Sequence, residues 1–120
     1  MVQTVRDMEV YQRAYKTALA IHRDTLKFPK EEQFALSSQI RRASKSICAN
    51  LAEGFAKNHK SPAEFKRYCL IALGSSEEML VWIDFAKDLE YITAQEWKTY
   101  EEQYRIVCKQ ISAMMDKWKT

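Results

Sequence analysis

The chain has 120 residues, of which 47% are hydrophobic, so it is long enough to form one domain with a buried core. It contains two glycines and two prolines, too few for the turns that an all-β or α/β fold needs. The net charge is +3, and no apolar run reaches the length of a membrane-spanning helix, so we expect an all-α protein with no membrane partner.

The sequence shows no sign of export or of a bound cofactor. Its first residues, MVQTVRDMEVYQRAYK, contain no apolar stretch of the kind found in signal peptides, so we expect a cytoplasmic location. The three cysteines, Cys48, Cys69 and Cys108, are far apart and form no CxxC pair. We therefore expect free thiols, with no metal site, disulfide framework or cofactor.

Two helices are predicted in the first half of the chain. Over residues 7–27, apolar or small residues recur at helical spacing, at positions 10, 14, 17, 21 and 25 or 26. Pro29 ends this helix and suits the first turn of the next one, which we expect over residues 30–57. One apolar face of that second helix is formed by Leu36, Ile40, Ala43, Ile47 and Leu51.

Capping signals mark two more helices, predicted over residues 62–89 and 94–118. Ser61 with Glu64 forms a capping-box pattern that has proline at its preferred place, and Thr93 with Glu96 repeats the pattern. Apolar or small residues then alternate steps of three and four, which is typical of a left-handed bundle: Phe65, Tyr68, Ala72, Ser75, Met79, Trp82, Ala86 and Leu89, and then Trp97, Tyr100, Tyr104, Val107, Ile111, Met114 and Trp118. Because the connections are short, the sequence predicts one domain over residues 1–120, an antiparallel up-down-up-down four-helix bundle.

Both glycines fall inside predicted helices, where glycine costs about 1 kcal/mol relative to alanine. In a hairpin of the second and third helices, Gly54 would face Phe65, and Gly74 would face the region of Ser44 and Lys45. Gly54 would then make room for an aromatic ring, and Gly74 would let a helix pass closely. The alternative is that one or both lie where a neighbouring subunit approaches, and position alone leaves this open.

A polar stripe runs along the second helix, with residues again three or four apart: Gln39, Arg42, Ser46, Asn50, Glu53 and Lys57. It has two interpretations. The stripe is a solvated face on which Glu53 and Lys57 form a favourable i, i+4 pair. Alternatively, Asn50 and Glu53 lie at a helix or subunit contact and fix its register through hydrogen bonds.

Charge is distributed unevenly along the chain. Residues 41–67 hold two acids and seven bases, namely Arg41, Arg42, Lys45, Lys57, Lys60, Lys66 and Arg67, a net of +5, whereas residues 77–102 have a net of −6. The basic segment is a candidate surface for phosphates, and His59 and Tyr68 are placed to stack on bases. Alternatively, these lysines solvate the surface, and the opposite charges set the register of subunits.

Catalytic patterns are absent from the sequence. Neither His22 nor His59 stands in a Glu-x-x-His motif of the di-iron type, and no HExxH, P-loop or dinucleotide fingerprint occurs. We therefore expect no enzymatic activity and no catalytic residue.

The stretches LSSQIRRASKSICANLAEGFAK and EFKRYCLIALGSSEEMLVWIDFAKDLEYI carry a family likeness. They resemble the 23S rRNA intervening-sequence proteins, also called the four-helix bundle protein family. The matching residues are Gln39 to Ala43, Ser46, Ile47, Asn50 to Gly54, Phe65 and Ala72 to Ser75, with Glu77 or Glu78 following. The likeness covers roughly residues 7–115.

This resemblance implies an antiparallel four-helix bundle that assembles into a ring-like homo-oligomer, a pentamer in known members. It also favours a packing or subunit-contact role for Asn50, Glu53 and Gly54 over a solvated one, and Gly74 stays a candidate for the same role. The accessory variability protein of diversity-generating retroelements is a similar basic pentamer that binds nucleic acid and the element's reverse transcriptase. Many members of the family have no assigned biochemical role.

Two classes of function remain. The first is a non-catalytic oligomer that binds nucleic acid, RNA above DNA, through the basic residues 41–67. The second is a protein-only scaffold whose ring presents a surface to a partner such as a reverse transcriptase. Exposed Trp97 or Trp118 would favour the second class, and a continuous basic surface would favour the first.

Overall fold

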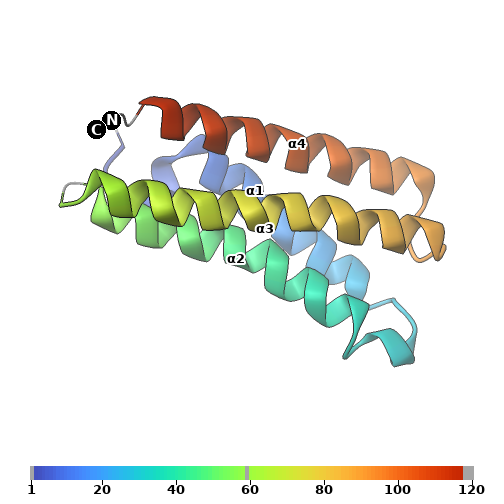
Figure 1. The fold of residues 1–120 in the computed structure, drawn as a ribbon. Coiled ribbons are helices and arrows are strands. Elements are labelled where there is room, and N and C mark those ends of the chain that lie inside the picture. Colours follow the sequence, from blue (N-terminus) through green and yellow to red (C-terminus); the bar gives the residue numbers. More distant parts are fainter. Residues whose placement is uncertain (1, 59, 118–120) are drawn as a thin grey trace.

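The computed structural model describes residues 2–58 and 60–117, and most of them lie in four long helices. These are α1 (Glu9–Thr25), α2 (Leu36–Lys57), α3 (Pro62–Asp88) and α4 (Ala94–Lys117), accompanied by the short 3-10 turns η1 (Val5–Asp7) and η2 (Lys30–Glu32). Each long helix packs against two others, in the cycle α1–α2–α3–α4, within a body of 45 × 24 × 21 Å (Figure 1). The predicted all-α four-helix fold is confirmed.

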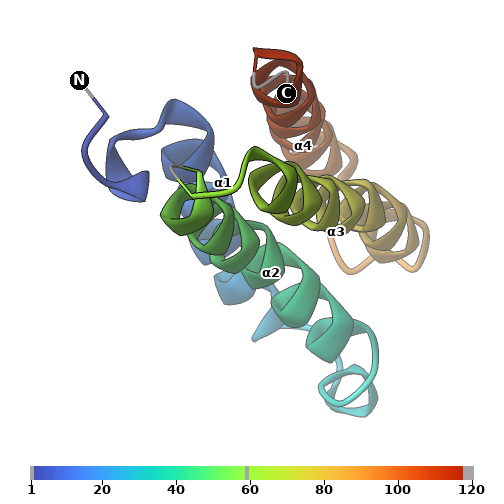
Figure 2. The ribbon, with the colours of Figure 1, turned by 60° about the vertical axis from the view of Figure 1, so that its left-hand side comes forward.

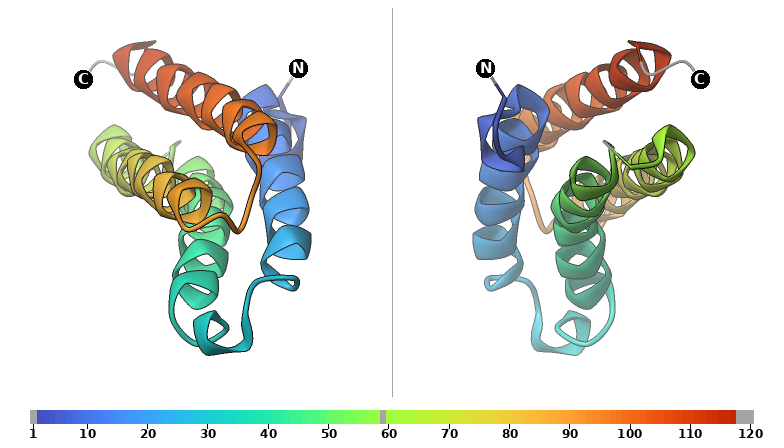
Figure 3. Two further views of the ribbon diagram at one scale, coloured as in Figure 1. Left: turned by 90° about the vertical axis from the view of Figure 1, so that its right-hand side faces the viewer. Right: turned by 90° about the vertical axis from the view of Figure 1, so that its left-hand side faces the viewer.

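Consecutive helices run antiparallel, and they form two pairs, α1 with α2 and α3 with α4. Figure 2 shows α2 and α3 side by side, which is the most extensive helix contact, and Figure 3 shows the α3–α4 pair inclined to the α1–α2 pair. The connection between α2 and α3 lies at the same end as η1 and the end of α4, and the other two connections lie at the opposite end (Figure 1). The basic second connection and the acidic third connection are therefore separated by the length of the bundle.

The predicted apolar faces form the core, with one change of register. On α2 the five predicted residues are buried, as are Val10, Ala14, Thr17 and Ile21 on α1. On α3, Tyr68 and Trp82 are half-buried and Leu89 is exposed, because the core-facing residues are Phe65, Cys69, Ala72, Ser76, Met79, Ile83 and Ala86. Five of the eight predicted positions on α3 are therefore confirmed as buried, namely Phe65, Ala72, Ser75, Met79 and Ala86. The buried face also includes Cys69, Ser76 and Ile83, because α3 packs against α2 on one side and α4 on the other.

The second helix begins at Leu36, and the expected start at residue 30 is wrong. The side-chain amide of Gln33 donates hydrogen bonds to the carbonyls of Thr25 and Phe28, at 2.9 and 3.0 Å. Arg41 in turn donates to Gln33 at 2.7 Å and to the Thr25 hydroxyl at 2.9 Å. These bonds satisfy the end of α1 and hold the connection as a loop with a single 3-10 turn.

The two predicted capping boxes differ. Thr93 and Glu96 exchange backbone-to-side-chain hydrogen bonds of 2.8 and 3.0 Å, as predicted. At the start of α3 the Ser61 hydroxyl accepts from the Glu64 N–H at 3.2 Å, but the Glu64 carboxylate pairs with Arg67. This second box is therefore only half formed.

Gly54 lies where α2 and α3 come close together. A Cβ at this position would stand 3.1 Å from the Tyr68 Cβ and 3.4 Å from the Phe65 carbonyl oxygen. The prediction that Gly54 faces Phe65 is confirmed, and a larger side chain would push the two helices apart.

We predict that Gly54→Leu lowers the free energy of unfolding by about 1–3 kcal/mol, the usual cost of overpacking a close contact. Urea denaturation followed by circular dichroism measures this loss. Ala56→Leu, at an exposed position two residues further along α2, is the matched control and should leave the free energy nearly unchanged. Equal stability of the two variants would contradict the close contact.

Candidate subunit interface and nucleic-acid surface

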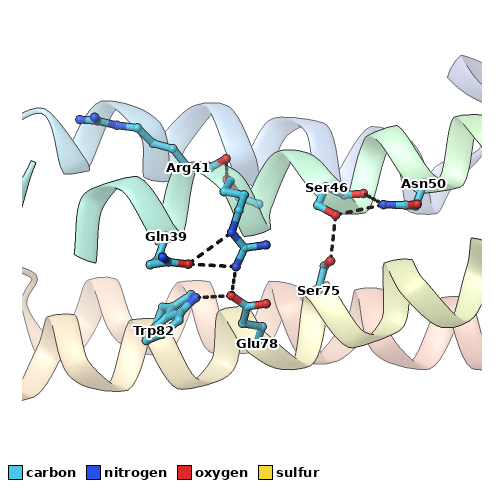
Figure 4. A network of polar contacts seen from close by, with 9 residues as sticks. Gln39, Arg41, Ser46, Asn50, Ser75, Glu78 and Trp82 are labelled. Atoms are coloured by element: carbon cyan, nitrogen blue, oxygen red, sulfur yellow. Dashed lines mark hydrogen bonds and ion pairs between the residues drawn. The ribbon is translucent and has the colours of Figure 1, made fainter. Parts of the chain in front are cut away.

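A polar network joins α2 to α3 (Figure 4). The Arg42 guanidinium donates to the Gln39 side-chain oxygen at 3.0 Å and forms an ion pair with Glu78 on α3. The Trp82 indole N–H donates to the same Glu78 carboxylate at 2.8 Å. Glu78 therefore ties an arginine of α2 to a tryptophan of its own helix.

A second group of polar contacts, separate from the first, lies around Ser46, one turn further along α2 (Figure 4). The Ser75 hydroxyl donates to the Ser46 hydroxyl across the helix contact at 3.0 Å. The Asn50 amide donates to the Ser46 carbonyl and hydroxyl at 2.8 and 3.0 Å. Asn50 is half-buried and orients Ser46, so this part of the polar stripe lies at a helix contact.

Glu53 differs from its neighbours in the stripe. Its side chain is exposed and, among the described residues, takes part in no hydrogen bond or ion pair. The i, i+4 pair expected with Lys57 does not form. Glu53 thus points to solvent in the single chain, next to the buried Gly54.

The outward face of α3 is largely apolar. Leu70, Gly74, Val81, Phe85 and Leu89 are exposed and, with the half-buried Glu78, are spaced at intervals of three or four residues that place them on one side of the helix. We call this set the α3 outer face. Since the opposite side of α3 forms the core, the helix is apolar on two sides, a pattern that belongs to helices covered all round.

Gly74 lies in the middle of the α3 outer face. Among the described residues, no atom comes within 4 Å of the place where its Cβ would be. The expectation that Gly74 lets another helix of the same chain pass closely, facing Ser44 and Lys45, is therefore wrong. The alternative of a neighbouring subunit at this position stays a prediction.

The seven basic residues of the predicted nucleic-acid surface fall into two groups. Four are engaged by side chains of the same molecule. Arg41 binds Gln33 and Thr25, Arg42 binds Gln39 and Glu78, Lys45 lies 2.9 Å from the His22 Nδ1, and Arg67 pairs with Glu64 at 2.9 Å.

The other three basic residues are Lys57, Lys60 and Lys66, around the connection between α2 and α3. In the described part of the chain their side chains have no hydrogen bond and no ion pair. Lys57 does help to hold the pKa of the Glu64 carboxyl below its usual range, after the larger effect of the Arg67 hydrogen bond. These three lysines, which we call the lysine end, leave their charges available to an external anion.

Aromatic side chains near the lysine end were expected to stack on bases. Tyr68 is half-buried, and the Arg67 guanidinium lies 4.5 Å from its ring centroid, so one face of the ring is already covered. His59 lies outside the described residues, as does Trp118. Trp97 is half-buried, donates to Asp84 at 2.8 Å and packs against the core.

The cysteines lie in apolar surroundings. Burial raises the pKa of the Cys48 and Cys69 thiols to about 11, so both are protonated near neutral pH and are weak nucleophiles. Among residues 2–58 and 60–117, no three His, Cys, Asp or Glu side chains gather as metal ligands would. Over the same ranges no helix is apolar and long enough to span a membrane.

Comparison with known proteins agrees with this fold. A family model described as 23S rRNA-intervening sequence protein matches residues 6–113, nearly the whole chain. The chain belongs to this family. The family description assigns no activity.

One solved structure is similar to the chain over almost its whole length. It is a protein of unknown function from the S23 ribosomal protein family of Bacteroides thetaiotaomicron, 25% identical, with a TM-score of 0.79. The match covers 89% of this chain and 95% of that one. The comparison with curated proteins finds no match.

Two features of the surface were missed from the sequence. The α3 outer face was missed because most of its residues lie between predicted core positions, and Leu89 was itself predicted in the core. A pair of tyrosines on α1, Tyr11 and Tyr15, was missed because the sequence analysis followed only the apolar positions 10, 14, 17, 21 and 25 or 26. Their separation of four residues, one helical turn, was the available signal.

We predict a coupling energy of about 1 kcal/mol between Arg42 and Glu78 in a double-mutant cycle of alanine variants, at the upper end for partly exposed ion pairs. Glu78→Gln should lose less stability than Glu78→Ala, because it keeps an acceptor for Trp82. The exposed Arg105–Glu101 pair, at 3.6 Å within α4, is the control and should couple more weakly. Denaturant unfolding of the variants measures both. A coupling energy near zero for Arg42 and Glu78 would contradict a stabilising role for this ion pair.

Proposed function

We propose that this protein is a non-catalytic homo-oligomer that binds nucleic acid, RNA above DNA. The proposal places assembly on the α3 outer face and phosphate binding at the lysine end. A pentamer is the assembly that the family resemblance implies, and a cytoplasmic location belongs to the same proposal. The observation that carries nucleic-acid binding is the set of three unpaired lysines at one end of the bundle.

Burial of apolar surface supports self-assembly. The α3 outer face exposes Leu70 to 58%, Phe85 to 53% and Val81 to 49%. Each large apolar side chain gains about 1.5–3 kcal/mol when fully removed from water, so covering this stripe with a second copy is a favourable step. Monomeric proteins rarely expose contiguous apolar patches of this kind.

Repetition in an oligomer supports phosphate binding. One lysine end offers three cations, which is few for stable nucleic-acid binding. A closed ring would place several lysine ends on one side and multiply the number of phosphates that are neutralised together. The acidic third connection, at the far end, would face away from the nucleic acid.

A protein-only scaffold is the second candidate. Phe34, in the loop before α2, is 97% exposed, and a groove nearby is lined by Leu36, Trp82, Phe85 and Leu89 among others. An aromatic side chain in this position suits contact with a partner protein, such as a reverse transcriptase. If nucleic-acid binding fails, this is the surface to examine first.

We predict that binding of labelled RNA weakens steeply with salt, because bound phosphates release counterions. Replacing Lys57, Lys60 and Lys66 together by alanine should weaken binding and lower the slope of log affinity against log salt by roughly 2 per subunit engaged. Fluorescence anisotropy across a salt series measures this.

The matched control replaces Lys27, Lys30 and Lys98, which are exposed at the other end of the bundle and carry the same charge. Equal loss in the two triple variants would contradict a specific lysine end, and no binding at low salt would contradict the proposal.

We predict that Phe85→Lys disperses the assembly into single chains of 14.1 kDa, because a charge within an apolar contact is costly to bury. Sedimentation velocity measures the mass. Leu26→Lys is the control, since Leu26 is 61% exposed but lies at the end of α1. An oligomer that survives Phe85→Lys would exclude the α3 outer face as the subunit contact.

A further inference from the structure

A second surface, along α1 and beside α2, combines aromatic rings with cations that form no ion pair within the described residues. A groove of about 300 Å³ is lined by Tyr11, Tyr15, Ala18, Leu19, His22, Lys45 and Cys48. A neighbouring hollow of about 470 Å³ is lined by Arg6, Tyr11, Gln12, Tyr15 and Lys16. Tyr11 and Tyr15 line both hollows, and we call the two hollows together the tyrosine groove.

The aromatic part of the groove is a pair of rings one helical turn apart. The centroids of Tyr11 and Tyr15 are 5.9 Å apart, with an angle of 28° between the ring planes. Tyr15 is 49% exposed, so part of its ring surface is open to a ligand. Exposed aromatic rings in a basic groove are the platforms on which single-stranded nucleic acids stack their bases.

The charged part of the groove is positive. Three cations, Arg6, Lys16 and Lys45, line the two hollows, and no acidic residue does. The side chains of Arg6 and Lys16 form no ion pair or hydrogen bond within the described residues. Asp7, the acid next to Arg6, accepts instead from the backbone N–H groups of Gln3 and Thr4.

Lys45 is held over the groove by a histidine. Its ammonium nitrogen lies 2.9 Å from the His22 Nδ1. Partial burial, then Lys45 and the nearby Arg41 and Arg23, lower the pKa of His22, which favours the neutral ring as acceptor for the Lys45 ammonium. This bond fixes the direction of Lys45 without neutralising its charge.

The groove begins at the end of the bundle that carries the lysine end. The turn η1, which contains Arg6, contacts α2, and it lies at the same end of the bundle as the α2–α3 connection (Figure 1). The part of the groove that Arg6 lines therefore lies at the end of the bundle that carries the lysine end.

We propose that the tyrosine groove binds a single strand of nucleic acid, with bases on Tyr11 and Tyr15 and phosphates on Arg6, Lys16 and Lys45. This inference rests on the proposed nucleic-acid binding and adds a site and a preference for single strands. A duplex keeps its bases paired and stacked, so it can use the cations of the groove but not the tyrosine rings.

The test compares a short labelled RNA strand with the same strand annealed to its complement. Tyr15→Ala should weaken binding of the single strand about 5- to 150-fold, the range for loss of one stacked base, and leave duplex binding almost unchanged. Tyr15→Phe keeps the ring and should bind the strand as the unchanged protein does. Circular dichroism and sedimentation of each variant establish that fold and mass are preserved.

A second measurement uses the unchanged protein and does not depend on variants. Ultraviolet cross-linking of the RNA strand, followed by peptide mass spectrometry, should place cross-links on the peptide that contains Tyr11 and Tyr15.

The outcomes separate the two proposals. RNA binding that is insensitive to Tyr15→Ala, with cross-links elsewhere, overturns the groove and leaves nucleic-acid binding intact. An equal loss for strand and duplex also overturns the groove as a single-strand site. A change of oligomer mass in Tyr15→Ala would assign the groove to a protein contact instead, and no binding of either RNA at low salt overturns both proposals.

Discussion

Helix α3 is apolar on two opposite sides, and the rest of the structure is arranged around this constraint. One side supplies Phe65, Met79 and Ile83 to the core, and the other leaves Leu70, Val81 and Phe85 in water. Contact with another molecule would remove this second side from water. The account of this protein as an oligomer follows from that constraint, and the absence of a side chain at Gly74 suits a close approach there.

The contact between α2 and α3 shows how the same helix is held in place. Gly54 permits close packing near the hairpin, and the Ser46–Ser75 and Arg42–Glu78 contacts fix the register further along. Glu78 belongs to both the network and the α3 outer face. The network therefore sets the rotation of α3 and, with it, the direction in which the apolar stripe is presented.

Much of this could be predicted from sequence, because helical period and capping are local properties. Of the polar stripe on α2, Arg42 and Ser46 bond to Glu78 and Ser75 of α3. Asn50 bonds to Ser46, whereas Glu53, expected beside it at a contact, is exposed. The start of α2 could not be predicted, because it depends on tertiary hydrogen bonds. The bonds of Gln33 and Arg41 hold the expected first turns of this helix as a loop. The sequence also could not predict which of the seven basic residues are engaged by other side chains, because that depends on which partners the fold brings near them.

The central claim is that another copy of the chain covers the α3 outer face. Hydroxyl-radical footprinting of the unmodified protein tests it directly, by comparing Phe85 with Tyr15, whose exposures in the single chain are similar at 53% and 49%. After correction for intrinsic ring reactivity, the account predicts that Phe85 is protected at high protein concentration while Tyr15 is oxidised freely. Oxidation of both rings in proportion to their single-chain exposure, at all concentrations, would contradict it.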